Sequence, residues 1–111
     1  MTPTEQEVKA GAARKTVEDV KGRKLTVERV KPSAYFDLLA AAGDKSANSA
    51  WLLTALRVVS VVEIDGVPVL RPETPDEIKA LADRLEWQGL AAVQDAMKEI
   101  DAGESPDSAK N

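Results

Sequence analysis

The sequence predicts an α+β domain in which helices predominate. Apolar and polar residues alternate around turn residues in two places, which is typical of β-hairpins. Four other stretches repeat apolar residues every three or four positions, which is typical of amphipathic helices. The spacing of apolar residues changes abruptly at Asp65-Gly66, after β-branched residues have replaced an apolar helical block. The expected order is a hairpin, two helices, a short hairpin and two C-terminal helices.

The first hairpin is expected from strands over residues 15–20 and 24–30. Gly22 lies between them and supplies the positive φ that a tight turn requires. Leu25 and Val27 fall on one face of the second strand because side chains alternate along a strand. Pro32 then ends the ladder, since proline has no N–H to donate.

Two short helices should follow. Ser33 is a suitable N-cap for the first, and Gly43 is suited to its C-terminal end. Residues 44–48 form a polar connection, after which Asn48 or Ser49 caps a second helix that runs through about residue 59. Its apolar positions are nearly continuous, so this helix is either central to the fold or covered by a partner.

The second hairpin is predicted by Asp65-Gly66 between alternating apolar residues, the strongest short-range hairpin signal. Pro68 cannot donate to a ladder, which places this hairpin at a sheet edge. Glu63 and Asp65 are close carboxylates, but acid–base or metal chemistry needs further convergent ligands. We interpret Asp65 as a turn residue and Glu63 as a solvent-facing strand residue.

The C-terminal helices begin with a distinct start signal. Thr74 is the predicted N-cap, Pro75 occupies the first helical position, and Glu77 completes a Thr-x-x-Glu capping box. The first helix should end or bend at Trp87-Gln88-Gly89. The second then carries an apolar stripe at spacings of 3, 4 and 3, formed by Leu90, Val93, Met97 and Ile100.

The expected organisation is a flexible arm over residues 1–14, one domain over 15–102 and a disordered tail over 103–111. The 111 residues include no histidine and no cysteine, which removes the commonest general base and the commonest zinc ligands. The net charge of −4 argues against binding a phosphate backbone. No apolar run approaches the roughly 20 residues that span a bilayer, and no signal peptide is evident. We therefore expect no catalytic residue, metal site, cofactor, nucleic acid or membrane contact.

The sequence leaves two roles open for its large apolar side chains. Trp51, Leu52 and Leu56 in the second helix could fill the core or face a partner, because aromatic residues serve both purposes. The same alternatives hold for Trp87 at the helix break, and for Leu90 and Met97 in the last helix.

Three segments taken together resemble the small tail assembly chaperones of tailed bacteriophages and prophages. These are GRKLTVERVKPSAYFDLLAAAG, SANSAWLLTALRVVSVVEIDGVPV and TPDEIKALADRLEWQGLAAV. The resemblance covers roughly residues 15–97. Its most characteristic pieces are Gly22-Arg23-Lys24, the stretch Ser60 to Val69 with its IDG-x-P turn, and the Ile78–Leu81–Leu85 stripe followed by Gly89-Leu90.

The resemblance implies a non-enzymatic role. Such proteins coat the tape measure protein, a very long apolar helical chain, until tail tube subunits displace them. They act in the cytoplasm of the bacterial host, are generally absent from the finished virion, and are thought to self-associate around their client. Many are also produced in a longer form by ribosomal frameshifting.

The leading hypothesis is therefore a chaperone that binds the tape measure protein through apolar helical surface. The partner-binding candidates are Trp51, Leu52, Leu56, Trp87, Leu90 and Met97. The first alternative is a structural tail completion or connector protein of the virion. The second is a small DNA-binding regulator built on a helix-turn-helix over residues 33–59, although residues 50–60 offer only Arg57 as a basic group.

Overall fold

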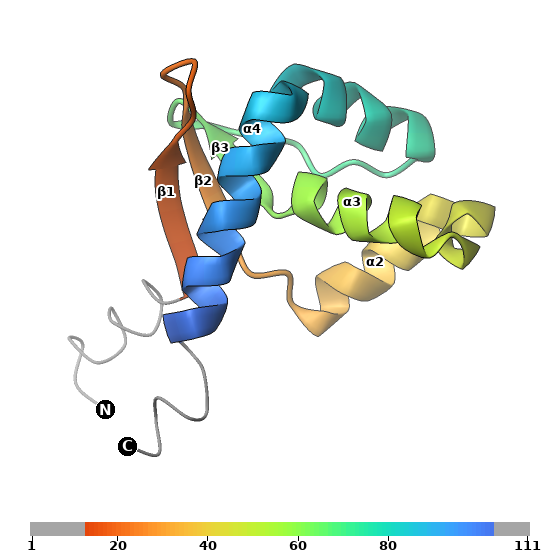
Figure 1. The fold of residues 1–111 in the computed structure, drawn as a ribbon. Coiled ribbons are helices and arrows are strands. Elements are labelled where there is room, and N and C mark those ends of the chain that lie inside the picture. Colours follow the sequence, from red (N-terminus) through yellow and green to blue (C-terminus); the bar gives the residue numbers. More distant parts are fainter. Residues whose placement is uncertain (1–12, 104–111) are drawn as a thin grey trace, which may run out of the picture.

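A computed structural model describes residues 13–103 of the chain. This part is an α+β domain with a four-stranded antiparallel sheet in the order β1-β2-β3-β4, as the sequence predicted in class. The second half of α4 lies across β1 and β2, and α3 packs against α4 (Figure 1). The elements are β1 (Arg14–Glu18), β2 (Lys24–Glu28), α2 (Pro32–Ala42), the 3-10 helix η1 (Gly43–Ala47), α3 (Ser49–Val59), β3 (Val61–Ile64), β4 (Val67–Pro68) and α4 (Pro75–Gly103).

The sheet joins the two predicted hairpins into one structure. In the first hairpin Val17 pairs with Leu25 and Thr16 with Thr26, and Gly22 has the positive φ of 82° expected in the turn. The hairpins meet because β2 also pairs with β3, with Leu25 opposite Ile64. The strand β4 forms one edge of the sheet, as Pro68 indicated. The pairing of β2 with β3 carries no local sequence signal, because the two strands are separated by α2 and α3.

The ends of the helices follow the predicted capping residues with one correction. The Asn48 side chain accepts a hydrogen bond from the N–H of Trp51 at 3.0 Å, and Thr74 Oγ1 accepts from the N–H of Glu77 at 3.1 Å. Ser33 is not the N-cap of α2. The helix begins two residues earlier than predicted, with Pro32 as its first residue and Lys31 as an N-cap that makes no side-chain bond. Proline fits there because the first N–H groups of a helix have no helical partner.

Each predicted limit of the domain differs by one residue from the outermost element of the structure. Arg14, assigned to the N-terminal arm, is the first residue of β1, and Gly103, assigned to the tail, is the last residue of α4. The remainder of both segments, residues 1–12 and 104–111, lies outside the described residues.

The break between the two C-terminal helices lies at Glu86 and not at Trp87-Gln88-Gly89. Glu86 has φ 62° and ψ 176°, whereas the residues on both sides are helical. The sequence indicated the break through Gly89, but Gly89 has helical geometry and serves another purpose. A Cβ atom there would lie 3.2 Å from Nη2 of Arg23 and 3.2 Å from Cβ of Leu85.

The core lies between the sheet and the helices. Leu25 and Val27 project from β2 and are fully buried, as their shared face predicted. They belong to one cluster with apolar residues from α2, α3 and both halves of α4. The buried members are Leu25, Val27, Leu38, Ala55, Val58, Val61, Ile78, Leu81, Leu85, Val93, Ala96 and Ile100.

Replacing a buried leucine should cost far more than replacing an exposed one. Leu85 is fully buried at the end of the first half of α4, whereas Leu70 is 92% exposed. We expect Leu85→Ala to lower the free energy of unfolding by about 2–4 kcal/mol, through lost burial and the cavity it leaves. Leu70→Ala should change it by less than about 0.5 kcal/mol. Equilibrium urea denaturation of both variants measures the difference, and equal effects would contradict this packing.

Candidate protein-binding surface

Several large apolar side chains of the described residues face solvent. The most exposed are Leu70 at 92% and Val20 at 86%, followed by Trp87 at 83%. Scattered exposed apolar residues are normal on a protein surface, whereas neighbouring ones on an uncharged surface indicate a contact site. The full set is Val20, Phe36, Leu53, Val67, Leu70 and Trp87.

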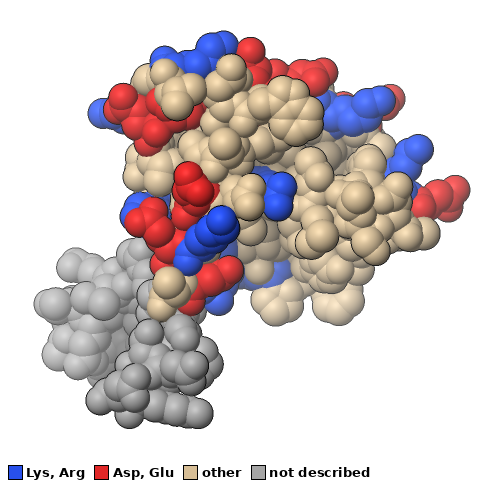
Figure 2. Space-filling model, in the orientation of Figure 1, with Lys and Arg blue, Asp and Glu red and all other residues tan. Residues whose placement is uncertain are grey.

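The two helices α2 and α3 carry little charge for their length. Asp37 is the one charged residue of α2, and Arg57 is the one charged residue of α3. Phe36 on α2 is 69% exposed and Leu53 on α3 is 60% exposed. The helices contact each other, and the part of the molecule that they occupy shows few charged atoms in Figure 2. We call Phe36 and Leu53, with the half-buried Tyr35, Leu39, Trp51 and Leu52, the α2–α3 apolar surface.

The structure places the three candidates of α3 beside the core and only partly in solvent. Trp51, Leu52 and Leu56 are all half-buried and pack against the core cluster. Ala55 and Val58 form the fully buried side of this helix. The large apolar side chain of α3 that is exposed is Leu53, which was not among the candidates predicted from the sequence.

The three candidates of α4 differ in their exposure to solvent. Trp87 is exposed and follows directly after the helix break at Glu86. Leu90 and Met97 are half-buried against the core, and the Met97 sulfur lies 3.9 Å from the Ser60 hydroxyl. The structure therefore brings five of the six candidates against the core cluster and leaves Trp87 in solvent.

Phe36 was missed although its position offered a signal. At helical spacing Tyr35, Leu38, Leu39 and Ala42 fall on one side of the helix, and Phe36 does not lie on that side. A large aromatic residue off the apolar stripe of a short helix is a candidate for an exposed contact. The signal for Leu53 was weaker, because nearly every position of α3 is apolar and no face could be distinguished.

A groove runs between the segment after β3 and the first half of α4. Val67, Val69 and Leu70 line one wall, and Ala80 and Leu81 line the other. Its rim carries both signs of charge, from Arg71, Glu73, Glu77 and Arg84. Arg71 forms an exposed ion pair with Asp37 of α2 at 3.1 Å.

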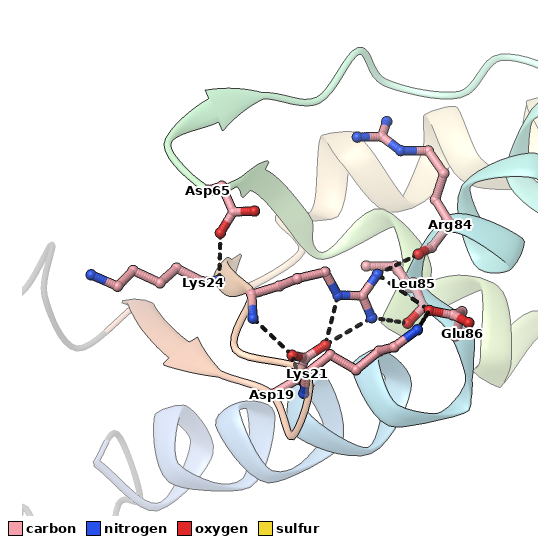
Figure 3. A network of polar contacts seen from close by, with 8 residues as sticks. Asp19, Lys21, Lys24, Asp65, Arg84, Leu85 and Glu86 are labelled. Carbon is pink, nitrogen blue, oxygen red and sulfur yellow. Dashed lines mark hydrogen bonds and ion pairs between the residues drawn. The ribbon is translucent and has the colours of Figure 1, made fainter.

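A polar cluster joins the β1–β2 turn to the bend in α4 (Figure 3). Asp19 Oδ1 accepts from the N–H groups of Lys21 and Arg23, both at 3.0 Å. Asp19 Oδ2 accepts from Nε of Arg23 at 2.9 Å. The same guanidinium donates to the carbonyl oxygens of Arg84 and Leu85, both at 2.6 Å. We call this arrangement the Asp19–Arg23 clamp.

The clamp is a structural device, because each of its charges is already satisfied. The side chain of Asp19 is completely buried. Burial favours the neutral acid and raises its pKa, but the hydrogen bonds and charge of Arg23 and the N–H of Lys21 outweigh this, so the pKa lies below the usual 3.8. A hydrogen bond from Lys21, at 2.5 Å, and the charge of that residue likewise lower the pKa of Glu86. Carboxylates held ionised by ion pairs are poor proton donors and acceptors at neutral pH.

Two further observations concern residues 13–103. No group of three or more histidine, cysteine, aspartate or glutamate residues in this range could hold a metal ion. No helix in the range combines the length and apolar character needed to cross a bilayer.

Comparison of the chain with protein-family models, curated proteins and solved structures gives no significant match.

Removing the Asp19 charge should destabilise the protein in a pH-dependent way. At pH 7, Asp19→Asn should lower the free energy of unfolding by about 2–3 kcal/mol, because Arg23 loses its buried counter-charge. The folded-state pKa lies below the unfolded value, so the charge stabilises the fold fully above about pH 4. This contribution is lost as the pH falls through the lowered folded-state pKa. Urea titrations of both proteins between pH 7 and pH 2 measure it, and a difference independent of pH would contradict it.

The two tryptophans should differ in their access to solvent. Trp87 is exposed and Trp51 is half-buried, so acrylamide should quench the emission of Trp87 more strongly. We expect Trp87→Phe to lower the Stern–Volmer constant of the folded protein by about half or more, and Trp51→Phe to raise it. Both variants should show equal quenching in 8 M urea. The opposite order in the folded state would show that Trp87 is covered.

Proposed function

We propose that this protein is a tail assembly chaperone of a tailed bacteriophage or prophage, which binds the tape measure protein through apolar helical surface. It acts without catalysis in the bacterial cytoplasm, and tail tube subunits displace it as the tube assembles. It is absent from the mature virion. Self-association around the client belongs to the same proposal.

The observation that carries the proposal is the α2–α3 apolar surface. A helical apolar client is bound by laying its apolar side against a surface of the same kind. Phe36 and Leu53 are more than half exposed on neighbouring helices that have one charged residue each. Exposed aromatic and aliphatic anchors that lie beside half-buried apolar residues suit such contacts, because the surrounding groups help to exclude water.

The remaining candidates extend this surface or support it. Trp51 and Leu52 are half-buried members of the α2–α3 apolar surface, and Leu56 packs against the core cluster. Trp87 offers a separate exposed anchor next to the bend in α4. Leu90 and Met97 pack against the core cluster. The flexible side chain of Met97 also adapts readily to different partners.

The decisive experiment is co-expression with the tape measure protein of the same phage or prophage. The chain should keep the client soluble and be recovered with it. In Phe36→Asp/Leu53→Asp, two carboxylates are placed in the contact, so affinity should fall at least tenfold, or about 1.4 kcal/mol. Both positions are exposed, so each change should alter the free energy of unfolding by no more than about 0.5 kcal/mol.

Val20→Asp is the matched control, because Val20 is 86% exposed in the β1–β2 turn. This variant should bind the client as the wild type does. Unchanged binding by the double variant would remove the α2–α3 apolar surface from the proposal. No complex with the wild-type chain would remove the chaperone role, and stoichiometric presence in purified particles would favour a structural tail completion or connector protein.

A further inference from the structure

Glu86 has a backbone conformation that its residue type opposes. Its φ of 62° and ψ of 176° lie in a region that is essentially restricted to glycine. Glutamate is a good helix former, and its neighbours on both sides are helical. Residues 84–88 contain neither proline nor glycine, so nothing in the local sequence requires a break at this position.

The apolar pattern of α4 continues through the break without a change of phase. Ile78, Leu81 and Leu85 precede it, and Val93, Ala96 and Ile100 follow it, all buried. Together with the buried Gly89 they recur at every third or fourth position. In an unbroken helix such residues share one side. The apolar pattern of α4 is therefore that of one long amphipathic helix, whereas the fold divides the segment into two helices.

Contacts from the β1–β2 turn hold the bend. At a break, the last carbonyl groups of the preceding helix lose their helical partners. Arg23 donates to the carbonyl oxygens of Arg84 and Leu85 at 2.6 Å, and Asp19 fixes the guanidinium from the other side. Lys21 Nζ binds Glu86 Oε1 at 2.5 Å. The bend is thus imposed by residues distant in sequence and has no local origin.

We propose that α4 is a two-state hinge at Glu86, with a bent state held by the Asp19–Arg23 clamp and a straight state in which residues 75–103 form one continuous helix. The second half of α4 contacts β1 and β2. Straightening therefore swings the first half outward and uncovers Ile78, Leu81 and Leu85. This inference concerns the conformation of the chain and holds whether or not the protein binds a tail protein.

Two substitutions at the hinge separate the states. Glu86→Gly and Glu86→Ala both remove the carboxylate that binds Lys21. Glycine accepts the bent backbone without strain and is a poor helix residue, whereas alanine opposes the bent backbone and is the best helix residue. Alanine should therefore favour the straight state and glycine the bent one.

The chain contains no cysteine, so Lys79→Cys/Lys98→Cys carries one spin label on each half of α4 without competing thiols. In a straight helix these Cα atoms are about 28 Å apart, from the 1.5 Å rise per residue, and any bend shortens the distance. Electron paramagnetic resonance measures the distance distribution in the full-length protein. The wild type should be mainly at the short distance, and the long-distance population of Glu86→Ala should exceed that of Glu86→Gly at least about fivefold.

A second label pair at Gln88 and Lys98 lies within one half of α4, so its distance should be the same in every variant. Identical distributions for Glu86→Ala and Glu86→Gly would overturn the proposal. Loss of far-ultraviolet helical signal in Glu86→Ala would overturn it as well, because the straight state retains its helix.

Discussion

The ion pair between Asp19 and Arg23 fixes the relation between the sheet and the long C-terminal helix. Asp19 organises the β1–β2 turn by accepting two backbone N–H groups, and it presents Arg23 to the end of the first half of α4. A cation at this position also opposes the negative end of the helix dipole. One guanidinium thus caps a helix, closes a turn and sets the direction in which the chain continues after Glu86.

Helices α2 and α3 carry more apolar side chains than the core buries. One side of α3 enters the core through Ala55 and Val58, and a second side is half-buried. Leu53 remains in solvent, as does Phe36 on the neighbouring helix. The proposed chaperone role uses this surplus, since a carrier of an apolar chain needs affinity that is reversible and uses no energy source. The proposed hinge would add a second apolar area, which the bent state covers.

Features that depend on adjacent residues could be read from the sequence. The caps at Asn48 and Thr74, the glycine turn at Gly22 and the edge position of Pro68 all follow from the chemistry of a few neighbouring residues. Features that join distant segments could not be read in this way. The pairing of β2 with β3 and the bonds from Arg23 to Arg84 and Leu85 depend on the assembled fold.

The candidate surface shows the same limit. Apolar character selected the right helix in α3, but the nearly continuous apolar run concealed which side chain faces outward. The location of the break in α4 was misread for a related reason. Gly89 has an evident propensity to interrupt a helix, yet its role is to leave space for Arg23, and the interruption falls on a glutamate that tertiary contacts constrain.

The position of β2 within the sheet has a consequence for folding during synthesis on the ribosome. The strand can pair with β1 as soon as the turn has emerged, but its other neighbour, β3, is made only after both α2 and α3. Until then one edge of β2 stays open to other chains, and its two apolar residues, Leu25 and Val27, are uncovered. The nascent protein is therefore most prone to aggregation over this interval, and the helical pair between the two strands is the part that must fold early to close it.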